Sequence, residues 1–263
     1  MFVDASTSDF QTIRSNAAMT LINTSLDSSR ENLTISIEGT PNSTITIPAK
    51  PTQSWLKENC KLERVIIWEA ETDGWAYSDE INDLFTAHFD KPVKLIYKGP
   101  EPRNSRGNGD PELYGEAVPH YFADVLSVQI ASEASLKDLN ERLASSPDAD
   151  AEALTIERFR PNIVIRGDVP WEEDSWKRVK ISTAGEEKQE ELDLDIVARC
   201  ARCQVPNVNP DTAEKNAKEP WNSLMKFRRV DTGGVAKYKP CFGMLALPKN
   251  EGALEVGCVL QVT

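Results

Sequence analysis

Short apolar runs separated by turn residues dominate the second half of the chain, and they limit the folds that are open to it. In the last of these runs apolar residues occupy every second position from Val256 to Val262, so that one side of a strand can face a core. A helix is predicted to begin at Pro220, because proline suits a first helical position. Many short strands with few helices favour a barrel or a sandwich in this half. The predicted strands are 162–165, 177–181, 194–197 and 255–262.

The first half of the chain also carries strand signals. Leu33, Ile35 and Ile37 alternate with polar residues, and Ile45 and Ile47 alternate again after a short gap, which predicts a hairpin.

A strand, a helix and a second strand are predicted to follow the hairpin. The two strands cover 64–68 and 93–97, and Ser78 is placed to cap a helix whose apolar residues recur with the helical period. The stretch 64–97 therefore reads as one strand–helix–strand unit.

The segment 98–116 is rich in glycine, proline and charge, and we interpret it as a linker or a mobile surface loop. It would separate a domain over 1–97 from a domain over 117–263. The second domain is expected to open with a strand over 125–130 and a helix after Ser135, with Asp138 completing a capping-box-like start.

Charge and cysteine content exclude several classes of protein. The formal net charge of −12 argues against a nucleic-acid surface, which needs a basic face. No window reaches the length of a membrane span, so no membrane segment is expected in this chain. Five cysteines are an odd number and too few for a disulfide framework, which favours a reducing, intracellular compartment.

Cys203 is the first candidate for chemistry, because its thiol lies where a predicted strand gives way to a turn-rich loop. The guanidinium of the neighbouring Arg202 would favour the thiolate, which binds soft metals and attacks electrophiles. Cys200 lies three residues earlier. A zinc site is disfavoured because there is no second Cys-x-x-Cys pair, and the proline-rich loop, with Pro206, disfavours a thioredoxin-like redox pair.

A second candidate group precedes the strand at 162–165. Arg158 and Arg160 flank Phe159 and are expected to share a face, where they could grip a phosphate or carboxylate with help from the Asn162 amide. Surface ion pairs with nearby acids are the simpler interpretation of this segment taken alone.

The segment 240–243 is read as a tight turn beside a strand. Its Cys241 is most simply a small buried hydrophobe.

Five motifs follow one another along the second half of the chain: RFRPN (158–162), WEEDSW (171–176), ARCQVPNVNPDT (201–212), EPWNSLMKFRR (219–229) and PCFG (240–243). In this order they resemble the MOSC domain, which is found at the C-terminus of molybdenum cofactor sulfurases and in the mitochondrial amidoxime reducing component. The residues at 122–124 and 132–143 extend the resemblance towards the amidoxime reducing branch. Residues 1–97 are similar to the latter part of the β-rich domain that precedes MOSC in that family, on the Thr12–Arg14 segment and the order of elements.

The resemblance implies an α+β fold, with a barrel-like MOSC domain after a truncated β-rich N-terminal domain. The truncation is expected because a Y-P-x-K-S-like segment and a later arginine that help to hold the pterin in the family are missing here. A segment upstream of Met1 could supply them and a mitochondrial signal. Without them, cofactor binding could also have been lost.

The resemblance also implies a cofactor and its site. Cys203 would be the protein ligand of molybdenum in a molybdenum cofactor (molybdopterin), and Arg160, Asn162 and Asp124 would lie at the cofactor site. Arg202 is placed there too, as the neighbour of the ligand. Pyridoxal phosphate binding is a family-level association, and Cys200 has no role in the family pattern.

The implied function is an oxidoreductase that reduces N-hydroxylated small molecules such as amidoximes or hydroxylamines. Electrons would come from a b-type cytochrome and its NADH-dependent reductase, because no flavin or iron–sulfur motif is present in the sequence. A carrier of the cofactor or a sulfur-transfer adaptor, and a scaffold that binds no metal, are the alternatives.

Overall fold

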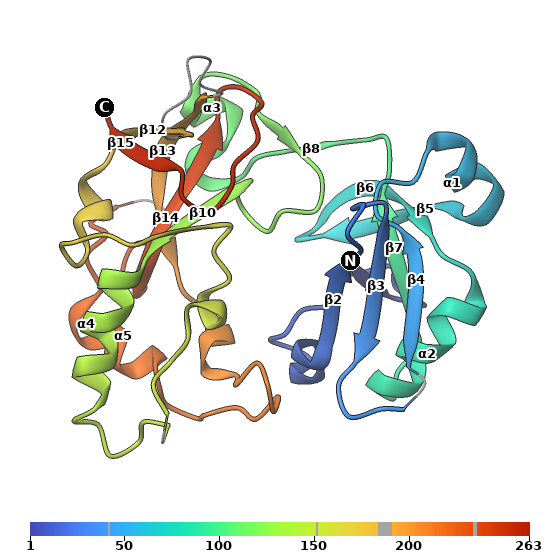
Figure 1. Ribbon diagram of the computed structural model, residues 1–263, viewed down its shortest axis with the longest axis horizontal. Coiled ribbons are helices and arrows are strands. Elements are labelled where there is room, and N and C mark those ends of the chain that lie inside the picture. The colour runs from blue at the N-terminus through green and yellow to red at the C-terminus, as the bar shows by residue number, and fades with distance from the viewer. Residues whose placement is uncertain (42, 151, 184–190, 234–235) are drawn as a thin grey trace. The chain divides into compact units, whose positions relative to one another are not determined.

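The structure of the protein, a computed structural model, describes residues 1–41, 43–150, 152–183, 191–233 and 236–263 (Figure 1). Helices and strands are mixed and strands predominate, which confirms the predicted α+β class. The chain divides into two compact units. The first comprises residues 1–103 and 208–215, and the second comprises 104–207 and 216–263.

The first unit contains a four-stranded sheet in the order β1-β7-β6-β5 and a three-stranded sheet in the order β2-β3-β4. The ring of Phe2 lies 4.7 Å from that of Phe85 and 5.3 Å from that of Phe89, and these rings share a core with Ile35 and Ile37. The strands are β1 (Phe2–Asp4), β2 (Ile22–Leu26), β3 (Asn32–Ile37), β4 (Thr44–Pro48), β5 (Lys61–Ile67), β6 (Ala70–Ala76) and β7 (Val93–Lys98), and the helices are η1 (Ala17–Leu21), α1 (Gln53–Asn59) and α2 (Asp79–Phe89).

The predicted hairpin is confirmed as the antiparallel pair β3–β4. The prediction of a simple strand–helix–strand unit over 64–97 is wrong, because β6 lies between β5 and α2 and pairs antiparallel with both β5 and β7. Its sequence, AETDGWA, contains two acids and a glycine, which hid the strand signal. Ser78 is the N-cap of α2 as predicted, although its side chain makes no capping hydrogen bond.

The second unit is built on a six-stranded sheet in the order β11-β10-β14-β13-β12-β15. Only the β10–β11 pair is parallel among the described pairs of this sheet. Ile163 and Ile165 of one edge strand pack against the same core cluster as Leu260 of the other edge strand. The sheet is therefore curled into a nearly closed, barrel-like form. Its strands are β10 (Val128–Ser132), β11 (Ile163–Ile165), β12 (Arg178–Ser182), β13 (Glu191–Ala201), β14 (Cys241–Pro248) and β15 (Val259–Val262).

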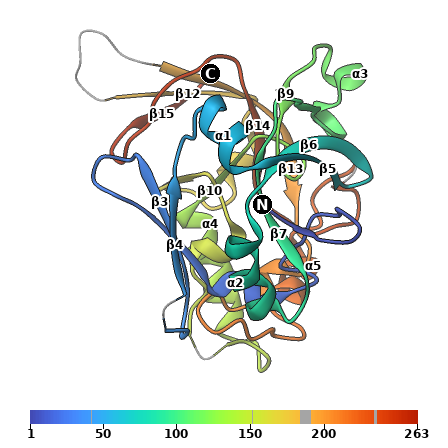
Figure 2. The same cartoon turned by 90° about the vertical axis from the view of Figure 1, so that its right-hand side faces the viewer.

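Two helices, α4 (Glu133–Leu143) and α5 (Trp221–Phe227), cover one face of this sheet at strands β10 and β14 (Figure 1 and Figure 2). Phe242 faces these helices and stacks on Phe159 with 3.8 Å between ring centroids, whereas Met244 belongs to the core on the other face. Short 3₁₀ helices connect the elements: η3 (Ile156–Phe159), η4 (Glu172–Ser175) and η5 (Val205–Asn207).

Short elements also occur within 98–116 and just after it. They are β8 (Arg103–Asn104), η2 (Gly107–Gly109), α3 (Pro111–Tyr114) and β9 (Pro119–His120). No helix in the described part of the chain is long and apolar enough to cross a bilayer.

The predicted strands at 162–165, 177–181 and 194–197 are confirmed, and α5 begins next to Pro220 as expected. Two other strands are shorter than predicted. Strand β10 begins at Val128 and not at residue 125, and β15 begins at Val259 and not at residue 255.

The tight turn predicted at 240–243 is wrong, because Cys241 opens strand β14. Gly243, which suggested the turn, adopts a φ of +75° inside the strand, and a Cβ there would lie 2.6 Å from the carbonyl oxygen of Ile130. Cys241 itself is fully buried, as predicted, and burial raises the pKa of its thiol to about 11.

The capping role predicted for Ser135 is also wrong, because α4 begins at Glu133 and Ser135 is buried inside its first turn. The hydroxyl of Ser135 donates to the carboxylate of Glu173 at 2.8 Å and accepts from the backbone N–H of Trp171. Asp138 instead pairs with Arg142 at 2.7 Å. Burial raises the pKa of the Glu173 carboxyl, the side chain of which is about 1% exposed.

Replacing Gly243 with alanine should lower the free energy of unfolding by about 2 kcal/mol or more, because the side chain would be strained at positive φ and would strike the Ile130 carbonyl. Chemical denaturation measures this change. Gly233→Ala is the matched control, since a Cβ there meets no atom within 4 Å. Equal stability of the two variants would contradict the close approach of β10 and β14.

Glu173→Gln should be more stable than the wild type near neutral pH, and its advantage should shrink as the pH falls towards 4.5, the ordinary glutamate pKa. The folded carboxyl keeps its proton to a higher pH than the unfolded one, so wild-type stability falls as the pH rises through this interval. Denaturation curves from pH 4 to 8 test the sign, with the exposed Glu172→Gln as control. The prediction would be refuted if the stability of the wild type, relative to that of Glu173→Gln, increased with rising pH.

Candidate functional site

Cys203 lies two residues beyond the end of β13, in the loop that leads to η5. This confirms the predicted position of the thiol at a junction between strand and loop. The side chain is half-buried, whereas Cys200 is buried, and all five cysteines are free thiols. The described residues contain no group of three or more His, Cys, Asp or Glu side chains that could hold a metal ion.

The loop that carries Cys203 is held by side chains from other segments. The indole N–H of Trp221 donates to the carbonyl of Arg202 at 3.3 Å, and the backbone N–H of Trp221 donates to Oδ1 of Asn207 at 3.2 Å. Nη1 of Arg158 donates to the carbonyl of Pro206 at 3.4 Å. These bonds fix the backbone on both sides of Cys203, which preorganises the thiol.

The guanidinium of Arg202 is buried and makes three hydrogen bonds. Nη1 donates to Oε1 of Gln129 at 3.1 Å and to Sγ of Cys200 at 3.0 Å, and Nη2 donates to the carbonyl of Phe159 at 3.0 Å. The prediction that this guanidinium lies beside the Cys203 thiol therefore needs correction: its sulfur partner is Cys200. Neighbouring residues in extended chain point to opposite sides, so adjacency in sequence did not bring the two groups together.

Arg158 and Arg160 do not share a face, contrary to the prediction. Arg158 is buried and forms an ion pair with Asp150 at 2.7 Å. Arg160 ends η3 in the left-handed conformation, with a φ of +56°, and its side chain is exposed. Of the two, only Arg160 presents its charge to the solvent.

Gln129, on β10, connects the predicted site residues. Its backbone N–H donates to Oδ1 of Asn162 at 2.8 Å, and its carbonyl accepts from the Asn162 N–H at 2.9 Å. Its side chain accepts from Arg202, which also binds the carbonyl just before Arg160. The segments that carry Cys203, Arg160 and Asn162 are thus joined through one buried network.

Asp124 is exposed and lies in the irregular segment that leads to β10. The role predicted for Asp124 at the cofactor site remains a prediction.

The site suits an anionic cofactor that brings its own metal ligands. Cys203 offers one half-buried thiol, a soft donor that could bind a metal brought in by a cofactor. Two buried atoms of the network, Nε2 of Gln129 and Nε of Arg202, have no hydrogen-bond partner among the described residues. With the exposed Arg160 and Asn162, the donor set favours a phosphate-bearing ligand.

Sequence reasoning missed Gln129 and Trp221 as parts of this site. Gln129 is the only polar residue in the run Val128–Ala131 of this strand, and that contrast is the signal that could have identified it. Trp221 belongs to a motif that was noticed, but nothing in the sequence shows that its indole N–H reaches the Cys203 loop.

Comparison with known proteins gives a consistent answer. The family model of the MOSC domain matches residues 118–261, which is more than half of the chain. The "Mitochondrial amidoxime-reducing component 1" of Homo sapiens is 29% identical over 248 residues, covering 94% of this chain and 67% of that protein. The "Mitochondrial amidoxime reducing component 2" of Bos taurus is 32% identical over 160 residues, covering 59% of this chain and 43% of that protein.

A third relative is the "Molybdenum cofactor sulfurase" of Solanum lycopersicum, 29% identical over 195 residues, which cover 71% of this chain and 22% of that protein. The chain thus spans about two thirds or less of the relatives that it matches. The family model, the order of the motifs and the barrel-like sheet agree, and the chain belongs to the MOSC domain family.

Proposed function

We propose that this chain holds a molybdenum cofactor through the thiolate of Cys203 and reduces N-hydroxylated small molecules. The names of the relatives connect their family with the molybdenum cofactor and with amidoxime reduction. The observation that carries the proposal is the half-buried Cys203 thiol, held at the end of β13 by Trp221 and by the Arg202 network.

The chain's own residues would have distinct roles. Cys203 would bind the metal, and Arg160 and Asn162 would orient the pterin and its phosphate by charge and hydrogen bonding. Asp124 would complete the site. Arg202 would act indirectly, because its hydrogen bonds fix the backbone that carries Cys203 and Arg160. When bound, the cofactor supplies two-electron redox chemistry, and the protein supplies binding, orientation and electrostatics.

Partners and location are part of the same proposal. A b-type cytochrome and its NADH-dependent reductase would donate the electrons, and the names of the relatives suggest mitochondria as the compartment. We also propose the division into 1–97, a connecting segment over 98–116, and a cofactor-binding domain over 117–263.

The Cys203→Ala variant should contain at least about tenfold less bound molybdenum than the wild type, because the metal would lose its protein ligand. The measurement is metal analysis of protein purified from cells that make the cofactor. Cys258→Ala is the matched control, since Cys258 is also a half-buried thiol but lies in the segment before β15.

Reduction of an amidoxime with an artificial electron donor separates the alternatives. Bound molybdenum without amidoxime reduction would indicate that the chain is a cofactor carrier or a sulfur-transfer adaptor and not an enzyme. Equal molybdenum in Cys203→Ala and Cys258→Ala would refute the ligand assignment, and a wild type without molybdenum would indicate a scaffold.

Arg202→Met should lower the free energy of unfolding by about 3 kcal/mol and speed the alkylation of Cys203. It removes three hydrogen bonds and leaves the Phe159 carbonyl and the Gln129 side chain without a donor. Mass spectrometry of the Cys203 peptide after brief labelling of folded protein gives the rate. The exposed Arg166→Met is the control. An unchanged labelling rate in Arg202→Met would show that Arg202 does not position the loop.

A further inference from the structure

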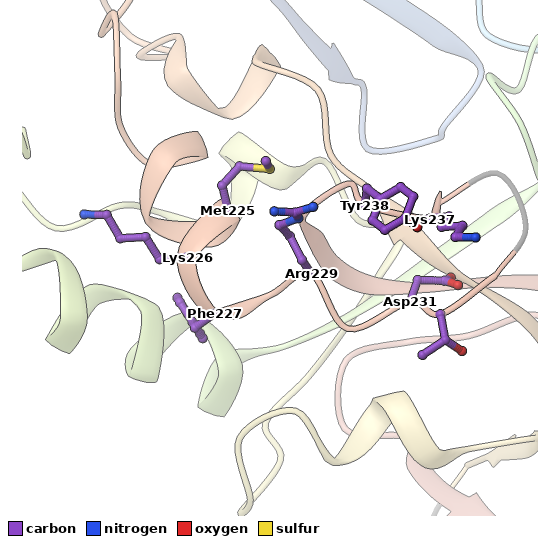
Figure 3. A pocket seen from close by; sticks show the side chains of 8 residues that line it. Met225, Lys226, Phe227, Arg229, Asp231, Lys237 and Tyr238 are labelled. Atoms are coloured by element: carbon purple, nitrogen blue, oxygen red, sulfur yellow. The ribbon is translucent and has the colours of Figure 1, made fainter.

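A hollow of about 500 Å³ lies between the C-terminal end of α5 and the segment that leads into β14 (Figure 3). Phe227 and Arg229 line it from one side, and Lys237 and Tyr238 line it from the other. None of these residues belongs to the predicted cofactor site.

A second buried arginine, Arg228, lies in sequence between the lining residues Phe227 and Arg229 and connects their segment to β14. Its Nη2 donates to both carboxylate oxygens of Asp174 at 2.9 and 2.7 Å, and its guanidinium carbon lies 4.0 Å from the ring centroid of Trp171. Nε of Arg228 donates to the carbonyl of Cys241, and the Cys241 N–H donates to the carbonyl of Arg228 at 2.9 Å. The two walls are therefore fixed to each other before any ligand enters.

At the rim of the hollow, two cationic side chains lie close to the aromatic ring of Tyr238. The guanidinium carbon of Arg229 lies 5.7 Å from the ring centroid of Tyr238, and Nζ of Lys237 lies 5.0 Å from it. Tyr238 is 64% exposed and has a φ of +65°, a conformation that few residues other than glycine adopt. The ring of Tyr238 is therefore presented to the solvent and not packed in a core.

The charges here are not neutralised by the protein. Within the described residues neither Arg229 nor Lys237 forms an ion pair, although the chain has 42 acidic against 30 basic residues. Asp231 is the single acidic side chain lining the hollow, and its Oδ1 accepts from the N–H of Gly233. The hollow therefore has a local positive potential, although the chain as a whole is acidic.

The C-terminal end of a helix attracts basic side chains for its own stability, which accounts for Lys226 and Arg229. In Figure 3 the ammonium group of Lys226 extends away from Arg229 and Tyr238. The helix end does not account for Lys237 or for the exposed ring of Tyr238, because both come from the segment after the helix.

We propose that this hollow binds a small phosphate-bearing molecule with a planar ring system, such as a nucleoside monophosphate. The guanidinium of Arg229 and the ammonium of Lys237 match the two charges of a phosphate monoester, and Arg229 can grip it in bidentate fashion. The face of Tyr238 provides a surface for stacking. The inference is independent of the proposed redox function, because it uses none of that site's residues.

Calorimetric titration of the full chain with AMP, inorganic phosphate and adenosine tests the site. AMP should bind most tightly, and raising the salt concentration should weaken its binding because the contact is ionic. Arg229→Gln/Lys237→Gln should weaken AMP binding at least about tenfold. Lys50→Gln/Lys57→Gln, which removes the same charge from exposed positions elsewhere, should leave AMP binding unchanged. Thermal melting of both double variants confirms that they fold.

Two more variants sharpen the test. Tyr238→Leu should weaken AMP binding but not phosphate binding, because only the stacking surface is lost. Cys203→Ala should bind AMP like the wild type, so that a failure of the cofactor assignment cannot be mistaken for a failure of this site. Absence of AMP and phosphate binding in the wild type, or equal affinity in the two double variants, would overturn the proposal.

Discussion

A guanidinium enclosed by protein needs hydrogen-bond acceptors around it, since an unpaired buried charge costs several kcal/mol. In Arg202 the partners come from three segments: the side chain of Gln129 on β10, the carbonyl of Phe159 at the end of η3, and the sulfur of Cys200 on β13. Movement of any one of these segments would break a bond of this set. The buried charge therefore fixes the segments that carry Cys203, Arg160 and Asn162.

Arg228 is a second buried arginine with partners from separate segments. It binds Asp174 and the carbonyl of Cys241, and the residue after Cys241, Phe242, stacks on Phe159. In both cases a buried arginine is followed by a residue that reaches the surface, Cys203 in one and Arg229 in the other. Rigid placement of a neighbouring reactive or charged group is the common result.

Alternating apolar residues were enough to predict the β3–β4 hairpin and the strands β12 and β13, because one face of each strand is buried. Strand β6 escaped prediction because its acids and glycine mask that alternation, and the start of β14 was predicted as a turn beside a strand because Gly243 suggested a turn. In β14 the glycine instead allows a close approach between two strands, which only the paired structure reveals.

At the site, the sequence placed the Cys203 thiol at the end of a strand, but it could not show which way the neighbouring side chains point. Arg202 turns to Cys200, and the two arginines of RFRPN separate into one buried and one exposed. These directions depend on contacts with Gln129 and Pro206, which are distant in sequence from their partners, and with Asp150, which is nearer to Arg158 but lies outside its motif. The motifs therefore identify the region of the site. Only the folded structure shows which of their residues are buried and support the site, and which are exposed and can contact a ligand.

The buried network leaves two donors unpaired among the described residues, Nε of Arg202 and Nε2 of Gln129. An unsatisfied buried donor costs about 1–3 kcal/mol, so the folded chain carries this penalty on its own. A ligand with acceptor oxygens that reached these atoms would recover part of it, and a ligand that binds only the folded state stabilises it by an amount that grows with the logarithm of the ligand concentration above the Kd. Both atoms belong to residues that join the segments carrying Cys203, Arg160 and Asn162. Such a gain in stability would therefore be coupled to the positions of those segments.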